Sequence, residues 1–163
     1  MKVALYKGTR PGWQGLYNRL GRVMDHGPYS HMELVLPNGL SASASALEGG
    51  VRIKDIGYST PENWDFIQIP DAYGPQVESW FSQHLGQPYD VWGNIKFCFG
   101  FVSDSSDRWF CSEAGMAALG DIAEPSRYGP NGAALYLLDR IHSGFWNVPF
   151  PANLAITYPL RKT

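Results

Sequence analysis

Charged residues are scarce in this sequence, and neither sign of charge dominates. Lys and Arg number 13 against 15 Asp and Glu, which gives a formal net charge of −2 at pH 7. Proteins that bind nucleic acid usually carry a basic patch that neutralises phosphates. No clustered run of Lys and Arg occurs here. We therefore expect no nucleic-acid partner.

Long apolar runs are also missing. No stretch approaches the roughly 20 apolar residues that a transmembrane helix needs. Residues 1–8 contain too short an apolar stretch for a signal peptide. The sequence thus predicts no transmembrane segment, and we expect a protein that is made and folded in a cytoplasm.

Cysteine is rare, since Cys98 and Cys111 are the only two in the sequence. They could form one disulfide, but a reducing cytoplasm disfavours it, so at least one thiol needs another explanation. No cluster of His, Cys and Asp has the spacing of zinc ligands. Gly49-Gly50 lacks the strand–turn–helix context and the Lys-Ser/Thr pair of a phosphate-binding loop. We expect no metal and no cofactor.

The chain does contain ample apolar material for a core. Hydrophobic residues make up 44% and aromatic residues 14% of the 163 residues. This composition is typical of globular proteins, and the length falls within the range of one domain. No repeat, low-complexity segment or linker divides the sequence. We expect a single domain over 1–163, in which 143–163 form an extended tail packed on the surface.

Hydrophobic periodicity predicts both strands and helices. Period-two alternation and turn residues indicate strands over these segments: 2–6, 31–36, 40–46, 51–53 and 64–70. Apolar residues at helical spacing, together with an Ala-rich stretch that Gly120 closes, indicate helices over these segments: 13–24, 75–87, 114–119 and 133–141. We therefore expect an α+β fold, in which helices pack on a small antiparallel sheet.

Cys111 stands directly before one of these helices and after a polar loop. The positive end of a helix dipole favours the thiolate form of a cysteine at that position. The backbone N–H groups of the first turn can also stabilise a developing oxyanion. A buried, inert cysteine is the competing interpretation, and position alone favours it.

His31 opens an expected strand, where its ring could face a helix start across a cleft. Glu33 lies two residues further and shares a face of the strand with His31, so its carboxylate could orient the imidazole. An exposed Glu in a salt bridge is an equally good interpretation of Glu33, and a surface histidine is the simpler one for His31. Ser43, on the return strand, is a second candidate for orienting the ring.

Three segments resemble the signature blocks of the NlpC-type papain-fold hydrolases: YSHMELV at 29–35, GQPYDVWG at 86–93 and FCSEA at 110–114. In the usual members the Pro-Tyr block comes first, the Cys-Ser block second and the histidine strand last. Here the histidine strand comes first. The sequence is therefore similar to the circularly permuted branch, which includes YiiX/YebB-like bacterial proteins, many phage proteins and lecithin:retinol acyltransferase-like enzymes.

The resemblance implies a permuted papain-like fold with Cys111 as nucleophile and His31 as general base. It also implies that Tyr89 lies beside the nucleophile and assists the oxyanion hole, although a core tyrosine would fit the sequence equally well. Relatives usually place a third polar residue on the strand after the histidine strand. That strand holds only serines here, among them Ser43, which makes Glu33 the candidate for this role.

The implied activity is cleavage of an amide or peptide bond through an acyl-enzyme, with peptidoglycan peptides as the expected substrate and a phage as the expected source. Such a protein would act in the virion or in the infected cell. One alternative is a thioesterase or acyltransferase on lipids, whose apolar cleft four aromatic residues could line: Trp92, Phe97, Phe99 and Phe101. Another is a phage structural or assembly protein that uses the fold as a scaffold.

Overall fold

A computed structural model describes residues 1–9, 12, 15, 19, 22–23, 25–91, 107–120 and 122–157. Within this part of the chain an antiparallel five-stranded sheet has the order β4-β3-β2-β1-β5. The strands are β1 (Lys2–Tyr6), β2 (His31–Val35), β3 (Ser41–Ser45), β4 (Gly50–Lys54) and β5 (Trp64–Gln68). The helices are α2 (Gly74–Gln83), α4 (Cys111–Leu119) and α5 (Pro130–His142), with short 3-10 turns at Pro61–Asn63, Asp71–Tyr73 and Pro125–Arg127.

Alternation along each strand divides the sheet into two unlike faces. On β1 the side chains of Val3 and Leu5 enter the main core, whereas Ala4 and Tyr6 belong to a second, smaller cluster on the opposite face. The same division continues on β2, where Met32 and Leu34 are fully buried in the main core. One face is therefore apolar and the other mixed.

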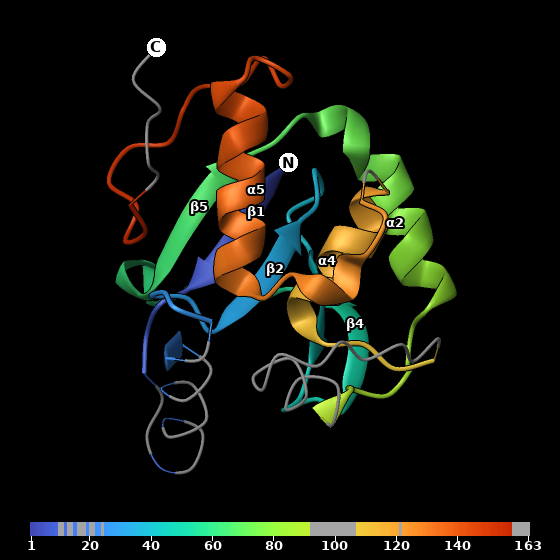
Figure 1. Cartoon of the computed structure of the whole chain (residues 1–163). Coiled ribbons are helices and arrows are strands. Elements are labelled where there is room, and N and C mark those ends of the chain that lie inside the picture. The colour runs from blue at the N-terminus through green and yellow to red at the C-terminus, as the bar shows by residue number, and fades with distance from the viewer. Residues whose placement is uncertain are drawn as a thin grey trace.

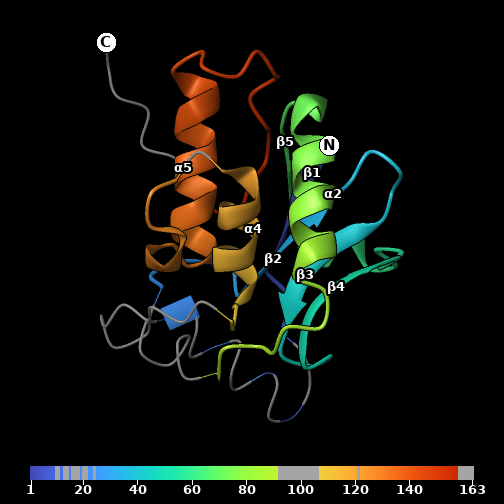
Figure 2. The ribbon, with the colours of Figure 1, turned by 90° about the vertical axis from the view of Figure 1, so that its right-hand side faces the viewer.

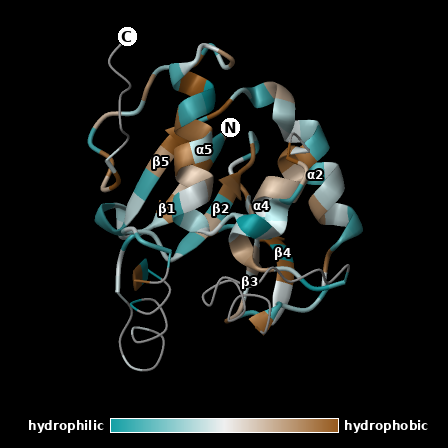
Figure 3. Cartoon of the chain, viewed as in Figure 1, coloured by the Kyte–Doolittle hydropathy of each residue, from teal (hydrophilic) through white to brown (hydrophobic). Residues whose placement is uncertain are grey.

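The three helices cover the apolar face of the sheet (Figures 1 and 2). Helix α4 packs on β2 and β3, α5 packs on α4 and β5, and α2 packs on α4 and the β3–β4 side. Figure 3 shows hydrophobic residues on the strands behind α4 and α5, and mixed colours along α2 and α5. This pattern is that of amphipathic helices closing one core.

The opposite face is covered in part by the connection between β4 and β5. These consecutive strands lie at opposite edges of the sheet, so the connection has to cross it. Ile56 and Tyr58 on this crossing segment pack against Trp64 and its neighbours, and the Tyr58 and Trp64 rings meet edge to face with centroids 5.0 Å apart. Aromatic contacts thus fasten the crossing segment beside the start of β2.

The start of α5 holds the backbone that leads into β2. Asn131 accepts a hydrogen bond from the Tyr29 N–H (2.9 Å) and donates one to the Tyr29 carbonyl (2.9 Å). The Asp25 carboxylate accepts from both the backbone and the side-chain nitrogen of Asn131 (2.8 and 2.7 Å). Asp25 thereby satisfies the N–H group of Asn131 at the start of the helix. The Asn131 side chain in turn anchors the backbone at Tyr29, two residues before His31.

Backbone hydrogen bonds connect the Pro-Tyr block, residues 86–90, both to β4 and to the residues just before α4. Val51 donates its N–H to the Gln87 carbonyl (2.9 Å), and Tyr89 donates to Gly49 (3.0 Å). On the other side Trp109 donates to Pro88 (3.2 Å). The segment 86–90 therefore ties the residues just before Cys111 to the edge of the sheet.

The expected α+β class and antiparallel sheet are confirmed, and each expected strand lies within two residues of an observed one. The last helix is confirmed and begins three residues earlier than expected, at Pro130. The helix expected over 75–87 ends instead at Gln83, because the chain turns through Gly86 at φ 78°. Leu85 lies beyond the end of the helix and is exposed.

Two further expectations concern regions that the description covers only in part. The helix expected over 13–24 lies mostly outside the described residues, as does the end of the tail after 157. The described tail, 143–157, contains no helix or strand, and its Trp146 is buried against the core. No helix among the described residues is long and apolar enough to cross a membrane.

A substitution at Gly50 tests the close contact between β4 and the Pro-Tyr block. A Cβ at Gly50 would lie 2.1 Å from the Gln87 carbonyl oxygen, which is backbone and cannot turn away. We expect Gly50→Ala to lower the free energy of unfolding by about 1–3 kcal/mol, the usual cost of overpacking. Urea unfolding followed by circular dichroism measures it.

Gly132→Ala is the matched control for this substitution. A Cβ at Gly132 would meet nothing closer than 3.8 Å, and the residue lies in helix α5. Its stability should stay the same or rise by up to about 1 kcal/mol. Equal stability of the two variants would contradict the proposed close approach at Gly50.

Candidate functional site

Cys111 is the first residue of α4, so it lies within the helix rather than just before it as the sequence suggested. Phe110 precedes it in extended conformation (φ −101°, ψ 167°), and the Glu113 carboxylate accepts the Phe110 N–H at 3.3 Å. A carboxylate in the first turn also interacts favourably with the helix dipole. At any helix start the first N–H groups lack the carbonyl four residues earlier that later N–H groups of the helix bind.

A glycine allows α4 to lie close to β2. A Cβ at Gly115 would come within 2.8 Å of the Met32 Cε atom. Met32 is fully buried between the sheet and the helix, and it directly follows His31 in β2. The short distance between helix and strand therefore brings the first turn of α4 next to the beginning of β2.

His31 lies at that beginning, with its side chain 20% exposed. Its Nε2 contacts the Glu33 Oε1 at 2.9 Å, and its ring meets the edge of Trp64 with centroids 6.5 Å apart. This confirms the predicted contact between His31 and Glu33. With Nε2 occupied, Nδ1 is the ring nitrogen left for Cys111.

Electrostatics couple His31 to Cys111. Burial by itself would lower the pKa of His31, but the negative charge of Cys111 and a hydrogen bond to its sulfur raise it, and Glu33 adds to this. The net effect holds the pKa of His31 at about 10. The imidazole is therefore protonated at neutral pH and lies next to the ionised carboxylate of Glu33.

Glu33 is nearly inaccessible, with 2% of its side chain exposed. Burial would raise the pKa of its carboxyl, but hydrogen bonds and charges of His31 and Arg52 lower it to about 2. The Arg52 guanidinium binds both carboxylate oxygens, with Nη2 at 2.5 Å from Oε1 and Nη1 at 2.9 Å from Oε2. Glu33 is thus an ionised, buried carboxylate with two cationic partners.

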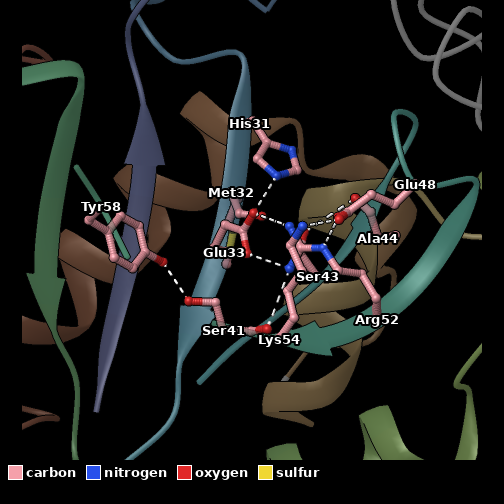
Figure 4. A network of polar contacts seen from close by, with 10 residues as sticks. All are labelled: His31, Met32, Glu33, Ser41, Ser43, Ala44, Glu48, Arg52, Lys54 and Tyr58. Carbon is pink, nitrogen blue, oxygen red and sulfur yellow. Dashed lines mark hydrogen bonds and ion pairs between the residues drawn. The ribbon is translucent and has the colours of Figure 1, made fainter. Parts of the chain in front are cut away.

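The chain of ion pairs continues beyond Arg52 (Figure 4). Arg52 Nε donates to Glu48, and Lys54 donates to the other oxygen of the same carboxylate. Sequence reasoning did not single out Arg52. In the sequence Arg52 stands out only as a charged residue that alternates with the apolar Val51 and Ile53 on β4. This pattern does not indicate that Glu33 is its partner.

Ser43 does not orient the imidazole. Its hydroxyl donates to the backbone carbonyl of Met32 at 2.7 Å, and only 1% of its surface is exposed. The prediction of Ser43 as a second orienting residue is therefore wrong, because a short side chain on β3 finds a closer acceptor in the neighbouring backbone. The same burial leaves almost no surface of Ser43 for contact with a substrate.

Tyr89 is 9% exposed and belongs to the main core. It forms a parallel bridge with Trp109, two residues before Cys111, which is near the position that the resemblance implied. The site thus brings together Cys111, His31 and Glu33, with Tyr89 on the adjoining segment. Several residues of the sequence argument lie outside the described residues: Trp92, Phe97, Cys98, Phe99 and Phe101.

Cys111 is a free thiol. Across the described part of the chain, no group of three or more His, Cys, Asp or Glu side chains could hold a metal ion. Comparison of the chain with protein-family models, with curated proteins and with solved structures finds no match. The family therefore stays an interpretation of the three sequence blocks, and the site has to be judged on its own geometry.

The pKa shifts predict how this network contributes to stability as pH changes. Glu33, with a lowered pKa, stabilises the fold above pH 4.5, and this contribution is lost as pH falls through about 2. His31, with a raised pKa, stabilises the fold below pH 6.5, and this contribution is lost as pH rises through about 10. Both contributions to stability are therefore complete only between about pH 4.5 and 6.5.

We therefore expect Glu33→Gln to reduce the free energy of unfolding most between about pH 4.5 and 6.5. The reduction should be about 3 kcal/mol or less, because His31 and Arg52 are partly exposed to solvent. Urea unfolding of both proteins from pH 3 to about 10 measures the difference. A difference that is constant over this range would contradict the ionised network.

Proposed function

We propose that this protein is a cysteine hydrolase that cleaves an amide bond through an acyl-enzyme, with a permuted papain-like fold. The observation that carries the proposal is the arrangement of His31. One nitrogen of its ring contacts a buried carboxylate, while the ring also interacts with the thiol at the N-terminus of α4. Nucleophile, base and orienting group in contact define this type of catalysis.

In the proposed mechanism Cys111 reacts in its thiolate form, with His31 as an imidazolium. The Cys111 sulfur attacks the carbonyl carbon, and the electrons of the C=O bond move to the oxygen. Backbone N–H groups in the first turn of α4 stabilise that oxyanion. Collapse of the intermediate breaks the C–N bond, and His31 gives its proton to the departing amine.

Hydrolysis of the acyl-enzyme completes the cycle. A water molecule attacks the thioester carbonyl, and the now neutral His31 accepts a proton from it. The C–S bond then breaks, which releases the carboxylic acid and restores the Cys111 thiolate. Glu33 contributes by holding the imidazole orientation and stabilising its cationic form. We place Glu33 in an orienting role, since its contact is with His31.

The substrate class rests on the resemblance of the three sequence blocks. Relatives cleave peptide bonds in peptidoglycan, so we propose muropeptides as substrates, and a phage protein as the context. The interaction of Cys111 with His31 argues against an inert scaffold. For the lipid alternative the described residues offer no supporting observation, because its cleft-lining aromatics lie outside them.

Removing the nucleophile tests the proposal directly. Purified muropeptides should be cleaved by the wild-type protein, and Cys111→Ala should reduce turnover by several orders of magnitude. The unfolding free energy should change by no more than about 2 kcal/mol, since only one sulfur is lost. Mass spectrometry of the products and urea unfolding provide the two measurements. Unchanged cleavage by Cys111→Ala would refute the assignment.

Glu33→Gln tests the orienting role. The amide keeps the shape of the carboxylate but removes its charge, so His31 loses the partner that favours the imidazolium. We expect turnover to fall by about 10²–10⁴-fold, which is less than for Cys111→Ala. Glu48→Gln, which removes a carboxylate that contacts only the outer part of the network, serves as the control and should keep near-normal turnover.

A further inference from the structure

Arg52 reaches Glu33 across an intervening strand. Glu33 lies on β2 and Arg52 on β4, with β3 between them. On β3 the residue directly paired with Arg52 is Ser43. Its short side chain turns toward the backbone of Met32 and leaves room for the guanidinium above it. The run of small residues on β3 thus allows a contact between two strands that are not neighbours (Figure 4).

The guanidinium is held in a fixed position by its other contacts. Nη1 and Nη2 bind the two oxygens of Glu33, Nη1 also lies 3.4 Å from the Ser41 carbonyl, and Nε binds Glu48. Each of the three guanidinium nitrogens of Arg52 therefore has a hydrogen-bond acceptor within the protein. Only 14% of the Arg52 side chain is exposed, so it has little surface with which to bind a ligand. Its contacts are instead with residues of the site.

The position of the shared oxygen has a chemical consequence. Oε1 of Glu33 accepts from Arg52 Nη2 at 2.5 Å and contacts His31 Nε2 at 2.9 Å. Arg52 therefore competes with the imidazolium for the same negative charge. A carboxylate without Arg52 would hold the proton of His31 more tightly, which would hinder its transfer to a leaving group.

We propose that Arg52 is a positioning residue, which clamps both oxygens of Glu33 and offsets its charge so that His31 stays oriented yet can release its proton. The catalytic meaning of this role rests on the proposed function, but the geometry does not. Other titratable or charged groups near the cluster come from several elements: Cys111 on α4, Tyr6 on β1, Glu48 and Lys54 beside Arg52, and Tyr58 and Asp55 on the crossing segment.

The test measures the pKa of His31 in the full-length protein carrying Cys111→Ala, which removes the strongest influence that raises it. The imidazole signals of the four histidines are titrated by NMR, and His31→Gln identifies the signal of interest. Arg52→Gln should raise the pKa of His31 by roughly 1 unit, because Glu33 loses its compensating charge. Glu33→Gln should lower it.

Two further variants complete the design. Lys54→Gln removes the same charge as Arg52→Gln but contacts Glu48 and not Glu33, so it should leave the pKa of His31 almost unchanged. Arg52→Lys keeps a charge that can bind only one oxygen, so it should raise the pKa of His31 by less than Arg52→Gln does. This variant keeps the test decisive if Arg52→Gln does not fold.

Opposite shifts for the Arg52 and Glu33 variants support the proposal, since loosening of the structure would move both toward the ordinary value. A lowered or unchanged pKa of His31 in the Arg52 variants overturns it. In the protein with Cys111 intact, Arg52→Gln should lower kcat about tenfold with little change in KM. If muropeptides are not cleaved but the opposite shifts occur, the proposed function fails and the role of Arg52 stands.

Discussion

The buried carboxylate of Glu33 is the constraint on which the site depends. A charge that is 2% exposed is costly unless it is paired and hydrogen-bonded. Its two partners come from opposite directions, His31 from the same strand and Arg52 from two strands away. To hold all three, the sheet has to keep the order β2-β3-β4, and β3 has to carry small side chains at the point of crossing.

The contact between sheet and helix adds a second requirement. His31 begins β2 and Cys111 begins α4, so the thiol and the imidazole meet where both elements start. Gly115 lets α4 lie directly on Met32, and the Asn131 side chain fixes the backbone at Tyr29 just before His31. The pair is therefore positioned by regular elements and by hydrogen bonds from α5. Rigid support of this kind would preorganise the geometry that the proposed catalysis needs.

Charge in this network alternates in sign along its length. Cationic His31, anionic Glu33, cationic Arg52 and anionic Glu48 follow one another, with Lys54 at the end. Each group favours the ionised form of the next, which explains why the pKa of His31 is raised and that of Glu33 is lowered. In the proposed hydrolase this network would keep the general acid His31 charged and oriented before substrate arrives.

Local patterns in the sequence were enough to predict most strands and helices and the contact between His31 and Glu33. Alternation placed His31 and Glu33 on one face of a strand, and the Ala-rich run that Gly120 closes predicted a helix directly after Cys111. These features depend on residues within a few positions of one another, whose geometry is set by the period of the strand or helix. The folded sheet was needed to show that Arg52, 19 residues from Glu33, binds it, and that Ser43 provides space rather than a hydrogen bond to His31. The register of strands across a whole sheet brings such partners together, and no local pattern encodes it.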